Sequence, residues 1–420
     1  MTIPTFREVE DRVGLTLREE GGLGAILVDL APLGRIERNF GSATYRALRG
    51  QIDPLLVELQ ERFQEGEALA RDERDGDRFF LFLSMREHAR ERGFEVGELR
   101  LLADRIEEFL GPRVARLTKP YTRERPVVSV GYGLVLYNPT ESSERQILRL
   151  IEDAVATGVM RARAQERQER EALIEIIYNY PQNIWTAFQP IVEIESEQVV
   201  AHEGLSRGPR GGELQAPTAL FGVAARHGLT EELERACRRK AFADWEVFGG
   251  SGRLFVNTVP ATVRDASFLG RGVIDYLGRS ISPRFVTLEI TERQVIENLA
   301  LYREAMHAFL ELGFTFAMDD LGAGYSGLET VANLGAGYLK IDMGLVRGVH
   351  QKRASQQIIK AILDMGVGVG ATVIAEGIQT REEAQALIDL GIRYGQGYLF
   401  ARPIDPYAPN PEPIVVKLGF

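Results

Sequence analysis

The sequence predicts an α/β fold in which a smaller α/β domain precedes an α/β barrel. Three observations lead to this prediction. A chain of 420 residues is too long for one ordinary hydrophobic core, so two domains are expected. From residue 185 onward, an amphipathic helix ending in Leu-Gly or Met-Gly is repeatedly followed by a short apolar strand. Helix–strand alternation sustained over about 230 residues is typical of an α/β barrel.

The composition is that of a soluble globular protein, with 45% hydrophobic and 26% charged residues. The net charge of -10 argues against a surface that coats a nucleic-acid polymer, although a local site can still bind a small anion. The single cysteine, Cys237, excludes an internal disulfide framework and fits a reducing compartment. No signal-peptide pattern and no apolar run near the roughly 18 residues of a membrane span are present, so we expect a cytoplasmic protein without membrane insertion.

Helix and strand patterns also alternate in the N-terminal part. RDERDGDRFFLFL, at residues 71–83, indicates a β-hairpin because a polar turn at Asp75-Gly76-Asp77 precedes an alternating apolar run. Leu99, Leu102, Ile106 and Leu110 recur at helical spacing and predict one apolar helix face. The expected elements, in chain order, are a helix within 1–20, a strand at 25–30, a helix at 45–63, the hairpin at 71–83, a helix at 95–110, a strand at 127–135 and a helix at 145–164.

This order resembles a GGDEF domain, the fold of diguanylate cyclases. DGDRF, at residues 75–79, stands where that family has its signature, and Asp29 matches the family's metal-binding aspartate on the first strand. Arg78 replaces the signature's glutamate, a metal ligand in the family, and a cation cannot ligate a metal. Asp75 replaces a glycine that lets the backbone approach a nucleotide closely. The resemblance therefore implies a degenerate domain without cyclase activity, which serves as a regulatory or dimerising module or as a retained scaffold.

The stretch MRARAQERQEREAL, at residues 160–173, is charged nearly all round. This pattern predicts a solvent-exposed helix between domains. Half of a dimeric coiled coil is the alternative, but the stretch is short and lacks a sustained apolar heptad. We place the degenerate GGDEF-like domain at 1–165, the helical linker at 166–180 and the barrel domain at 181–420.

The predicted barrel strands end in polar residues. In α/β barrels the carboxyl ends of the strands meet at one mouth, which holds the active site. Two adjacent carboxylates follow the strand FTFAM, and neighbours on a strand point to opposite sides, so they can serve two different ions. An aspartate that caps the next helix is the plainer interpretation of one such pair alone. The residues at the strand ends are Glu203, Asn257, Glu289, Asp319, Asp320, Lys340, Glu376 and Gln396.

Converging carboxylates repel one another unless they are protonated or neutralised by a cation. An oxygen-rich set favours Mg²⁺ or Mn²⁺ over zinc, and no His-Cys cluster is present in the sequence. His202 precedes Glu203 and is expected to face the other side of its strand, in a structural role.

Residues 180 to about 405 resemble an EAL domain, the cyclic di-GMP phosphodiesterase family, whose fold is a modified TIM (β/α)8 barrel. EGLSR beginning at Glu203, FQPI with Gln189, the Asn257 strand, the ExTE strand, DD-GAGYS, LKID, AEG and QGY follow in family order. Many short motifs in one order are far more specific than any one of them.

The resemblance implies a role for each matching residue. The first metal would be held by Glu203, Asn257, Glu289 and Asp319. The second would be held by Asp319 and Asp320, with Glu376 nearby. Lys340 would position the attacking water, and Glu376 would assist proton removal. The substrate would contact Gln189, Arg207 and Gln396. Glu292 would tether the loop Gly322–Gly327 without touching either ion.

Three positions depart from the family pattern without removing a ligand: Gly204, Leu321 and Gly327. Two functions remain. The first is a Mg²⁺/Mn²⁺-dependent phosphodiesterase that converts cyclic di-GMP to linear pGpG with two ions. The second is a non-catalytic cyclic di-GMP receptor that signals to a protein partner. The complete ligand set favours the enzyme. The resemblance also implies a homodimer formed through the barrel domain, and the N-terminal domain leaves room for a regulatory protein partner.

Overall fold

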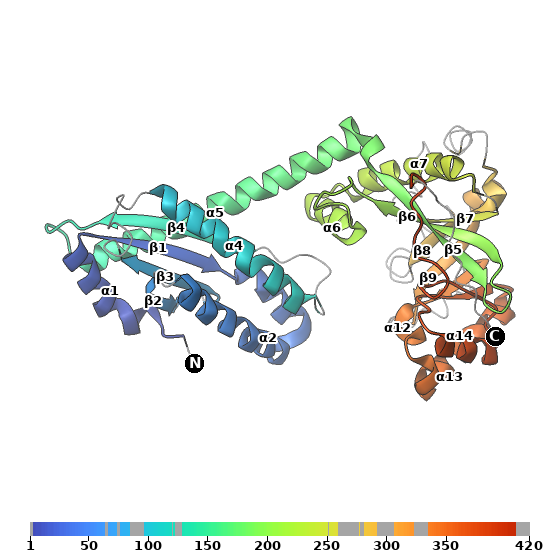
Figure 1. The fold of residues 1–420 in the computed structure, drawn as a ribbon, viewed down its shortest axis with the longest axis horizontal. Helices are drawn as coiled ribbons and strands as arrows, with labels where there is room; N and C mark the ends of the chain where they lie inside the picture. Colours follow the sequence, from blue (N-terminus) through green and yellow to red (C-terminus); the bar gives the residue numbers. More distant parts are fainter. Residues whose placement is uncertain are drawn as a thin grey trace. The chain divides into compact units, whose positions relative to one another are not determined.

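The computed structural model describes residues 3–63, 66–73, 76–84, 96–119, 121, 128–250, 252–258, 277, 281–291, 306–322 and 335–408. The chain splits into two compact units, Met1–Ala172 and Leu173–Phe420 (Figure 1). The boundary falls near the end of one continuous helix, α5 (Ser143–Ile174), where the sequence suggested two helical segments. The division into residues 1–165, 166–180 and 181–420 stays a prediction.

The N-terminal unit is built on a four-stranded antiparallel sheet with the order β2-β3-β1-β4. The predicted hairpin is present because β2 pairs antiparallel with β3, although Asp75 of its turn lies outside the described residues. The elements are α1 (Phe6–Glu20), β1 (Gly22–Asp29), η1 (Ala31–Leu33), α2 (Gly34–Phe63), β2 (Gly66–Arg71), β3 (Arg78–Ser84), α4 (Val96–Thr118), β4 (Ser129–Leu136) and α5.

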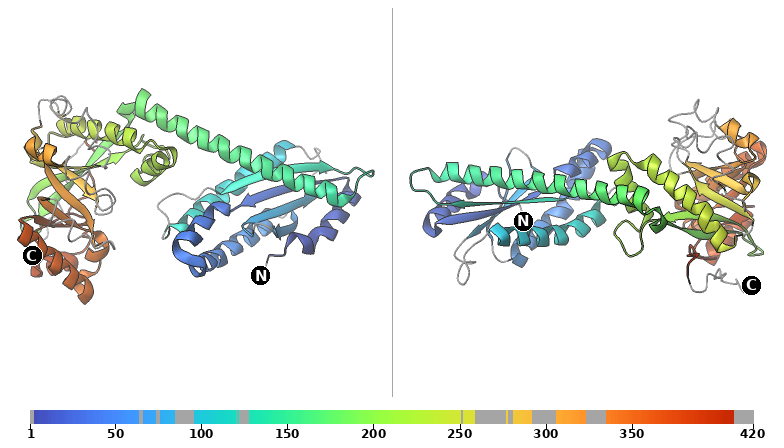
Figure 2. Two further views of the ribbon diagram at one scale, coloured as in Figure 1. Left: turned by 180° about the vertical axis from the view of Figure 1, so that it is seen from behind. Right: turned by 90° about the horizontal axis from the view of Figure 1, so that it is seen from above.

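Helices cover both faces of this sheet, and each face has its own apolar core. Along β1, Ile26 and Val28 pack with α2 and α4, whereas Ala25 and Leu27 pack with α1 and α5. This division follows from the two-residue period of a strand. Figure 1 shows α2 and α4 over one face, and the left view of Figure 2 shows α5 across the other. The four residues predicted to form the apolar face of the 95–110 helix are all buried.

Helix α5 touches the sheet at a pair of glycines. A Cβ atom added to Gly131 of β4 would meet the carbonyl oxygen of Ala154 and the backbone of Gly158, both in α5. Backbone atoms cannot move aside as a flexible side chain can. Gly131 is therefore required for the close approach of α5 to the sheet.

We expect Gly131→Ala to destabilise the N-terminal unit by about 1–3 kcal/mol or more, because overpacking forces α5 off the sheet. Gly50→Ala is the matched control: Gly50 lies in α2 with nothing within 4 Å of the added Cβ. In a helix interior that change is stabilising by roughly 0.5–1 kcal/mol. Urea unfolding midpoints measure both, and equal midpoints for the two variants would contradict the close contact.

The C-terminal unit is a closed eight-stranded barrel with the order β10-β11-β12-β5-β6-β7-β8-β9, as the sequence predicts. Strand β5 runs antiparallel to both neighbours, and the other seven strands run parallel to one another. The elements are η2 (Glu175–Asn179), η3 (Pro181–Asn183), β5 (Trp185–Glu193), β6 (Val199–Arg207), α6 (Pro217–His227), α7 (Thr230–Phe248), β7 (Arg253–Asn257), η6 (Pro283–Phe285), β8 (Val286–Thr291), β9 (Thr315–Leu321), β10 (Tyr338–Ile341), α12 (Met343–Val346), η7 (Val349–Gln351), α13 (Arg353–Val369), β11 (Thr372–Ala375), α14 (Arg381–Asp389) and β12 (Tyr394–Gly395).

The interior of the barrel contains an apolar layer, which we call the middle layer. Its members form one cluster: Ile191, Ala201, Phe255, Ala317 and Ile374, with Tyr338 and Tyr394 packed against it. Residues on one face of a strand recur every second position. The residues two positions along each strand therefore form the next layer toward either end of the barrel.

One predicted helix end is wrong. The sequence placed a helix C-cap at Gly366, but α13 continues through it to Val369 and is capped by Gly370 in a left-handed conformation, with a φ of 73°. Gly366 is buried inside the helix. A Cβ there would lie 2.7 Å from Val373 Cγ2, so this glycine brings α13 close to β11.

His202 of β6, which is expected to have a structural role, and Cys237 of α7 are both buried. His202 stacks edge-on against Trp245 and Phe248 of α7, and burial lowers its pKa to about 4. Cys237 is also buried, and burial raises the pKa of its thiol to about 12. Within the described ranges, no helix combines the length and the apolar character that a membrane crossing requires.

Candidate active site at the carboxyl ends of the barrel strands

Polar residues form the layer above the middle layer. The strand period brings them together, since each stands two positions from a middle-layer position on its strand. For β5, which runs the other way, the step is backward from Ile191 to Gln189. The residues related in this way to the middle layer are Gln189, Glu203, Asn257, Asp319, Lys340, Glu376 and Gln396; Glu289 of β8 pairs beside Asn257.

Lys340 is fully buried at the centre of this layer. Its Nζ lies 2.5 Å from Glu289 Oε1, 2.6 Å from Glu376 Oε1, and 3.4 Å from both Glu203 Oε2 and Asp319 Oδ1. One ammonium therefore contacts four carboxylates that come from four different strands or strand ends. Burial disfavours its charge, but the carboxylates outweigh that effect and raise the pKa of Lys340 well above its ordinary value.

A single positive charge does not balance four carboxylates. Burial, together with the negative charge of Glu203, raises the pKa of Glu289 well above its ordinary value. Burial also raises the pKa of Glu376, despite the nearby charge of Lys340. For Glu203, burial is outweighed by the charge of Lys340 and by a hydrogen bond from Gln396, so its pKa is lowered. The layer therefore carries an excess of negative charge that either protons or a bound cation must offset.

Two amides complete the layer. Gln396 Nε2 donates to Glu203 Oε2 at 2.5 Å and to Glu376 Oε1 at 3.2 Å. Asn257 Nδ2 lies 3.4 Å from Glu203 Oε1, at the long end of hydrogen bonding. The structure thus brings together every predicted metal-ligating or catalytic residue among these strands except Asp320.

Of the three predicted substrate residues, Gln189 and Gln396 belong to this layer, and Arg207 lies at the end of β6. Gln189 is buried and donates from Nε2 to the carbonyl oxygen of Ala401 at 3.2 Å. Arg207 ends β6 and is half-buried. Burial lowers its pKa, and the charges of Tyr398 and Glu203 oppose that shift. Tyr398, to which the motif QGY assigns no role, has 53% of its surface exposed.

A β-bulge places Asp319 and Asp320 opposite Lys340. In the pairing of β9 with β10, Met318 faces Leu339 and Leu321 faces Ile341, so two residues oppose one. Asp320 has a φ of 59°, a left-handed conformation that is uncommon for a residue other than glycine. The simple alternation expected from the sequence does not hold here, because the bulge adds one residue to β9.

Two predicted features lie outside the described residues: Glu292, and the loop Gly322–Gly327 beyond Gly322 itself. Leu321, one of the departures from the family pattern, is buried in the core around the barrel. Gly204 is also closely surrounded, since an added Cβ would lie 3.3 Å from Thr186 Cγ2 and 3.4 Å from the carbonyl oxygen of Phe255.

The donor set fits a hard divalent cation. Both oxygens of Glu289, Oδ1 of Asp319 and Oε1 of Gln396 are buried. Glu289 Oε1 and Asp319 Oδ1 face Lys340 Nζ, whereas Glu289 Oε2 and Gln396 Oε1 have no hydrogen-bond partner within the described ranges. Oxygen donors with excess negative charge are what Mg²⁺ and Mn²⁺ prefer. In the same ranges, no group of three or more Asp, Glu, His or Cys side chains has the geometry to hold a metal ion as it stands. Lys340 Nζ instead stands among the carboxylates.

Fold and site together define an α/β-barrel protein whose strand ends carry a lysine-centred carboxylate cluster. The chain belongs to the EAL domain family, whose model matches residues 181–403.

Three known proteins illustrate the similarity. Escherichia coli PdeA, described as a probable cyclic di-GMP phosphodiesterase, is 35% identical over 36% of this chain and 21% of its own length. Pseudomonas aeruginosa MucR, described as a bifunctional diguanylate cyclase/cyclic di-GMP phosphodiesterase, is 25% identical over 84% of this chain and 52% of its own length. The Xanthomonas citri FimX EAL domain, solved in complex with c-diGMP, shares the fold with a TM-score of 0.52, 19% identity, and coverage of 58% of this chain and 96% of that one. Across the curated relatives compared, this chain spans between 21% and 52% of the relative's length.

Proposed function

We propose that the C-terminal unit hydrolyses cyclic di-GMP to linear pGpG with two divalent ions, Mg²⁺ or Mn²⁺. The observation that carries this proposal is the convergence of four carboxylates on the buried ammonium of Lys340. The descriptions of PdeA and MucR support the choice of substrate. The N-terminal unit is proposed to be a degenerate GGDEF-like domain.

The first ion would be held by Glu203, Asn257, Glu289 and Asp319, and the second by Asp319 and Asp320, with Glu376 nearby. When bound, a pair of such ions generates a hydroxide at neutral pH and stabilises charge on the attacking and leaving oxygens of the phosphodiester.

The chain's own residues would position the carboxylates, accept a proton and contact the substrate. Lys340 keeps the carboxylates together and brings positive charge to where charge develops on the phosphate. Glu376, whose pKa burial raises, is suited to accept a proton from the attacking water. Gln396 fixes the orientation of Glu203 and Glu376 through one amide. Arg207 presents a planar fork of donors to a phosphate or a guanine edge.

The test is incubation of the purified chain with cyclic di-GMP and Mn²⁺, followed by chromatography of the products. We expect pGpG, and we expect a chelator to abolish its formation. A 3′,5′-cyclic mononucleotide is the control substrate and should stay intact. Tight binding of cyclic di-GMP without any product would contradict the enzyme assignment.

The alternative function is a cyclic di-GMP receptor without catalysis. One observation favours it: Lys340 Nζ already neutralises part of the carboxylate cluster at distances as short as 2.5 Å. A lysine that permanently takes the place of a metal would leave a binding site without a catalyst. The same assay distinguishes the receptor from the enzyme, because a receptor binds the dinucleotide and leaves it unchanged at every metal concentration.

The N-terminal unit is expected to make no cyclic di-GMP from GTP. Arg78 Nε donates to Asp29 Oδ2 at 2.9 Å, and the backbone N–H of Ala31 donates to Asp29 Oδ1 at 2.8 Å. Both oxygens of the carboxylate that the GGDEF resemblance assigns to a metal are thus engaged. The measurement uses the full chain carrying Glu203→Gln, so that any product survives, with GTP and Mg²⁺. Detectable cyclic di-GMP would overturn the assignment.

A further inference from the structure

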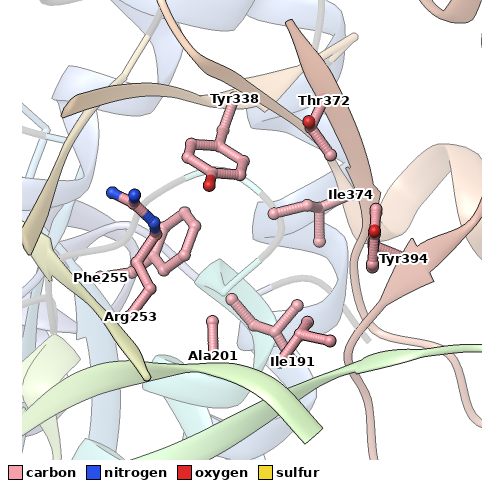
Figure 3. A pocket seen from close by; sticks show the side chains of 9 residues that line it. Ile191, Ala201, Arg253, Phe255, Tyr338, Thr372, Ile374 and Tyr394 are labelled. Carbon is pink, nitrogen blue, oxygen red and sulfur yellow. The ribbon is translucent and has the colours of Figure 1, made fainter. Parts of the chain in front are cut away.

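A pocket opens at the end of the barrel opposite the carboxylate layer. It has a volume of about 140 Å³. Its floor is the middle layer, and its rim comes from residues at or near the first positions of the parallel strands. Figure 3 shows the side chains arranged around one open space. They are Ile191, Val200, Ala201, Arg253, Phe255, Tyr338, Thr372, Ile374 and Tyr394.

Among the described residues that line this pocket, only Arg253, the first residue of β7, is charged. Its Nη1 donates to Thr287 Oγ1 at 3.1 Å and to Thr315 Oγ1 at 3.0 Å, which holds the guanidinium at the pocket wall. The guanidinium also lies 5.4 Å from the centroid of the Tyr338 ring. Among the residues that the structure describes, no carboxylate comes within ion-pair distance of Arg253. Arg253 is half-buried, and no described carboxylate neutralises it, so its guanidinium can pair with an anion from solution.

We propose that this pocket binds a small organic anion, a carboxylate carried on a flat aromatic or short apolar body. The guanidinium fork of Arg253 matches a carboxylate, which it binds with two parallel hydrogen bonds. The hydroxyls of Tyr338, Thr372 and Tyr394 offer further polar contacts at the rim. The Phe255 ring and Ile374 form an apolar surface beneath them.

The size of the pocket sets the size of the ligand. A cavity of about 150 Å³ lined by apolar side chains holds one benzene molecule. The pocket's 140 Å³ is close to that value, so it suits a single ring whose carboxylate stays at the rim beside Arg253, and it is too small for a dinucleotide. The middle layer separates the pocket from the carboxylate layer, so the two sites take different ligands.

A purely structural role for Arg253 is the competing explanation. Its hydrogen bonds to Thr287 and Thr315 join the starts of β7, β8 and β9. On that view, removal of the guanidinium lowers stability, and the pocket binds nothing.

The probe is benzoate, compared with benzyl alcohol as its uncharged counterpart. Methyl-resolved NMR of the full chain follows Ile191, Ala201 and Ile374, whose methyl groups report on the pocket without any mutation. We expect benzoate to shift these signals and to bind roughly tenfold or more tightly than benzyl alcohol, the scale of a charge-assisted hydrogen-bond pair. We expect Arg253→Gln to weaken benzoate binding roughly ten- to a hundredfold and to leave benzyl alcohol unchanged. Arg284→Gln, at an exposed arginine outside the pocket, should change neither.

Three outcomes would overturn the proposal. The pocket methyl signals fail to move with benzoate, benzyl alcohol binds as well as benzoate, or Arg253→Gln binds benzoate as the wild type does. If Arg253→Gln does not fold, the wild-type comparison of the two probes at the methyl signals still decides. None of these measurements depends on hydrolysis of cyclic di-GMP, so failure here leaves the proposed function untouched.

Discussion

Cyclic di-GMP hydrolysis is expected to fall at least about a hundredfold in Glu203→Gln, since even residues that only support a metal ligand contribute 10- to 100-fold. Glu203 is buried, contacts Lys340 Nζ at 3.4 Å and accepts a hydrogen bond from Gln396. The glutamine keeps the size of the side chain but removes a charged oxygen donor. The cation would then bind more weakly, and turnover should need more Mn²⁺ to reach half of its maximum.

The matched control is Glu193→Gln. Glu193 ends β5 and pairs with Arg393 at 2.6 Å, away from the carboxylate layer. This variant should keep wild-type turnover and the wild-type dependence on Mn²⁺. Near-normal turnover of Glu203→Gln at low Mn²⁺ would rule out Glu203 as a ligand.

The second large effect is expected for Lys340→Met, which keeps an unbranched side chain of nearly the same length and removes its charge. Without metal, the variant should lose about 3–5 kcal/mol of stability, the usual cost of breaking a buried ion pair by removing one partner. Four carboxylates would then face one another with only amides between them. Added Mn²⁺ should raise the melting temperature of the variant more than that of the wild type, because the ion replaces the missing positive charge.

Turnover separates the two roles of Lys340. If the ammonium also acts on the phosphate or the water, kcat falls by about 10²–10³ even when Mn²⁺ has restored stability. Wild-type kcat with a lowered melting temperature would reduce Lys340 to a structural counter-charge. Loss of substrate affinity at unchanged kcat would instead indicate uniform binding.

Much of the barrel could be predicted because its signals are local. Period-two strands and glycine helix ends are visible in the sequence, and Gly313 and Gly335 indeed have positive φ. Gly366 follows a methionine in the same pattern, but the helix end predicted there was wrong. This glycine is required by its close packing against Val373 and not by the end of a helix.

The residues of the site could be predicted from the sequence, but their positions relative to one another could not. Strand-end position predicted that Glu203, Glu289 and Glu376 meet, and the structure brings them to one lysine. The bulge at Asp319 and Asp320 could not be predicted, since it depends on how β9 pairs with β10. The direction of β5 was equally invisible, because a strand's partners are set by tertiary packing rather than by its own residues.

The middle layer has an electrical consequence. It consists mostly of apolar side chains, so charges on its two sides are screened far less than charges in water. Arg253 and Asn257 are four residues apart on β7, which is about 13 Å of strand. At an effective dielectric constant of about 20, one unit charge at that distance changes the potential by roughly 1 kcal/mol per unit charge. Neutralising the guanidinium at one end of the barrel therefore makes the other end more negative and favours a cation there, without any movement of the backbone.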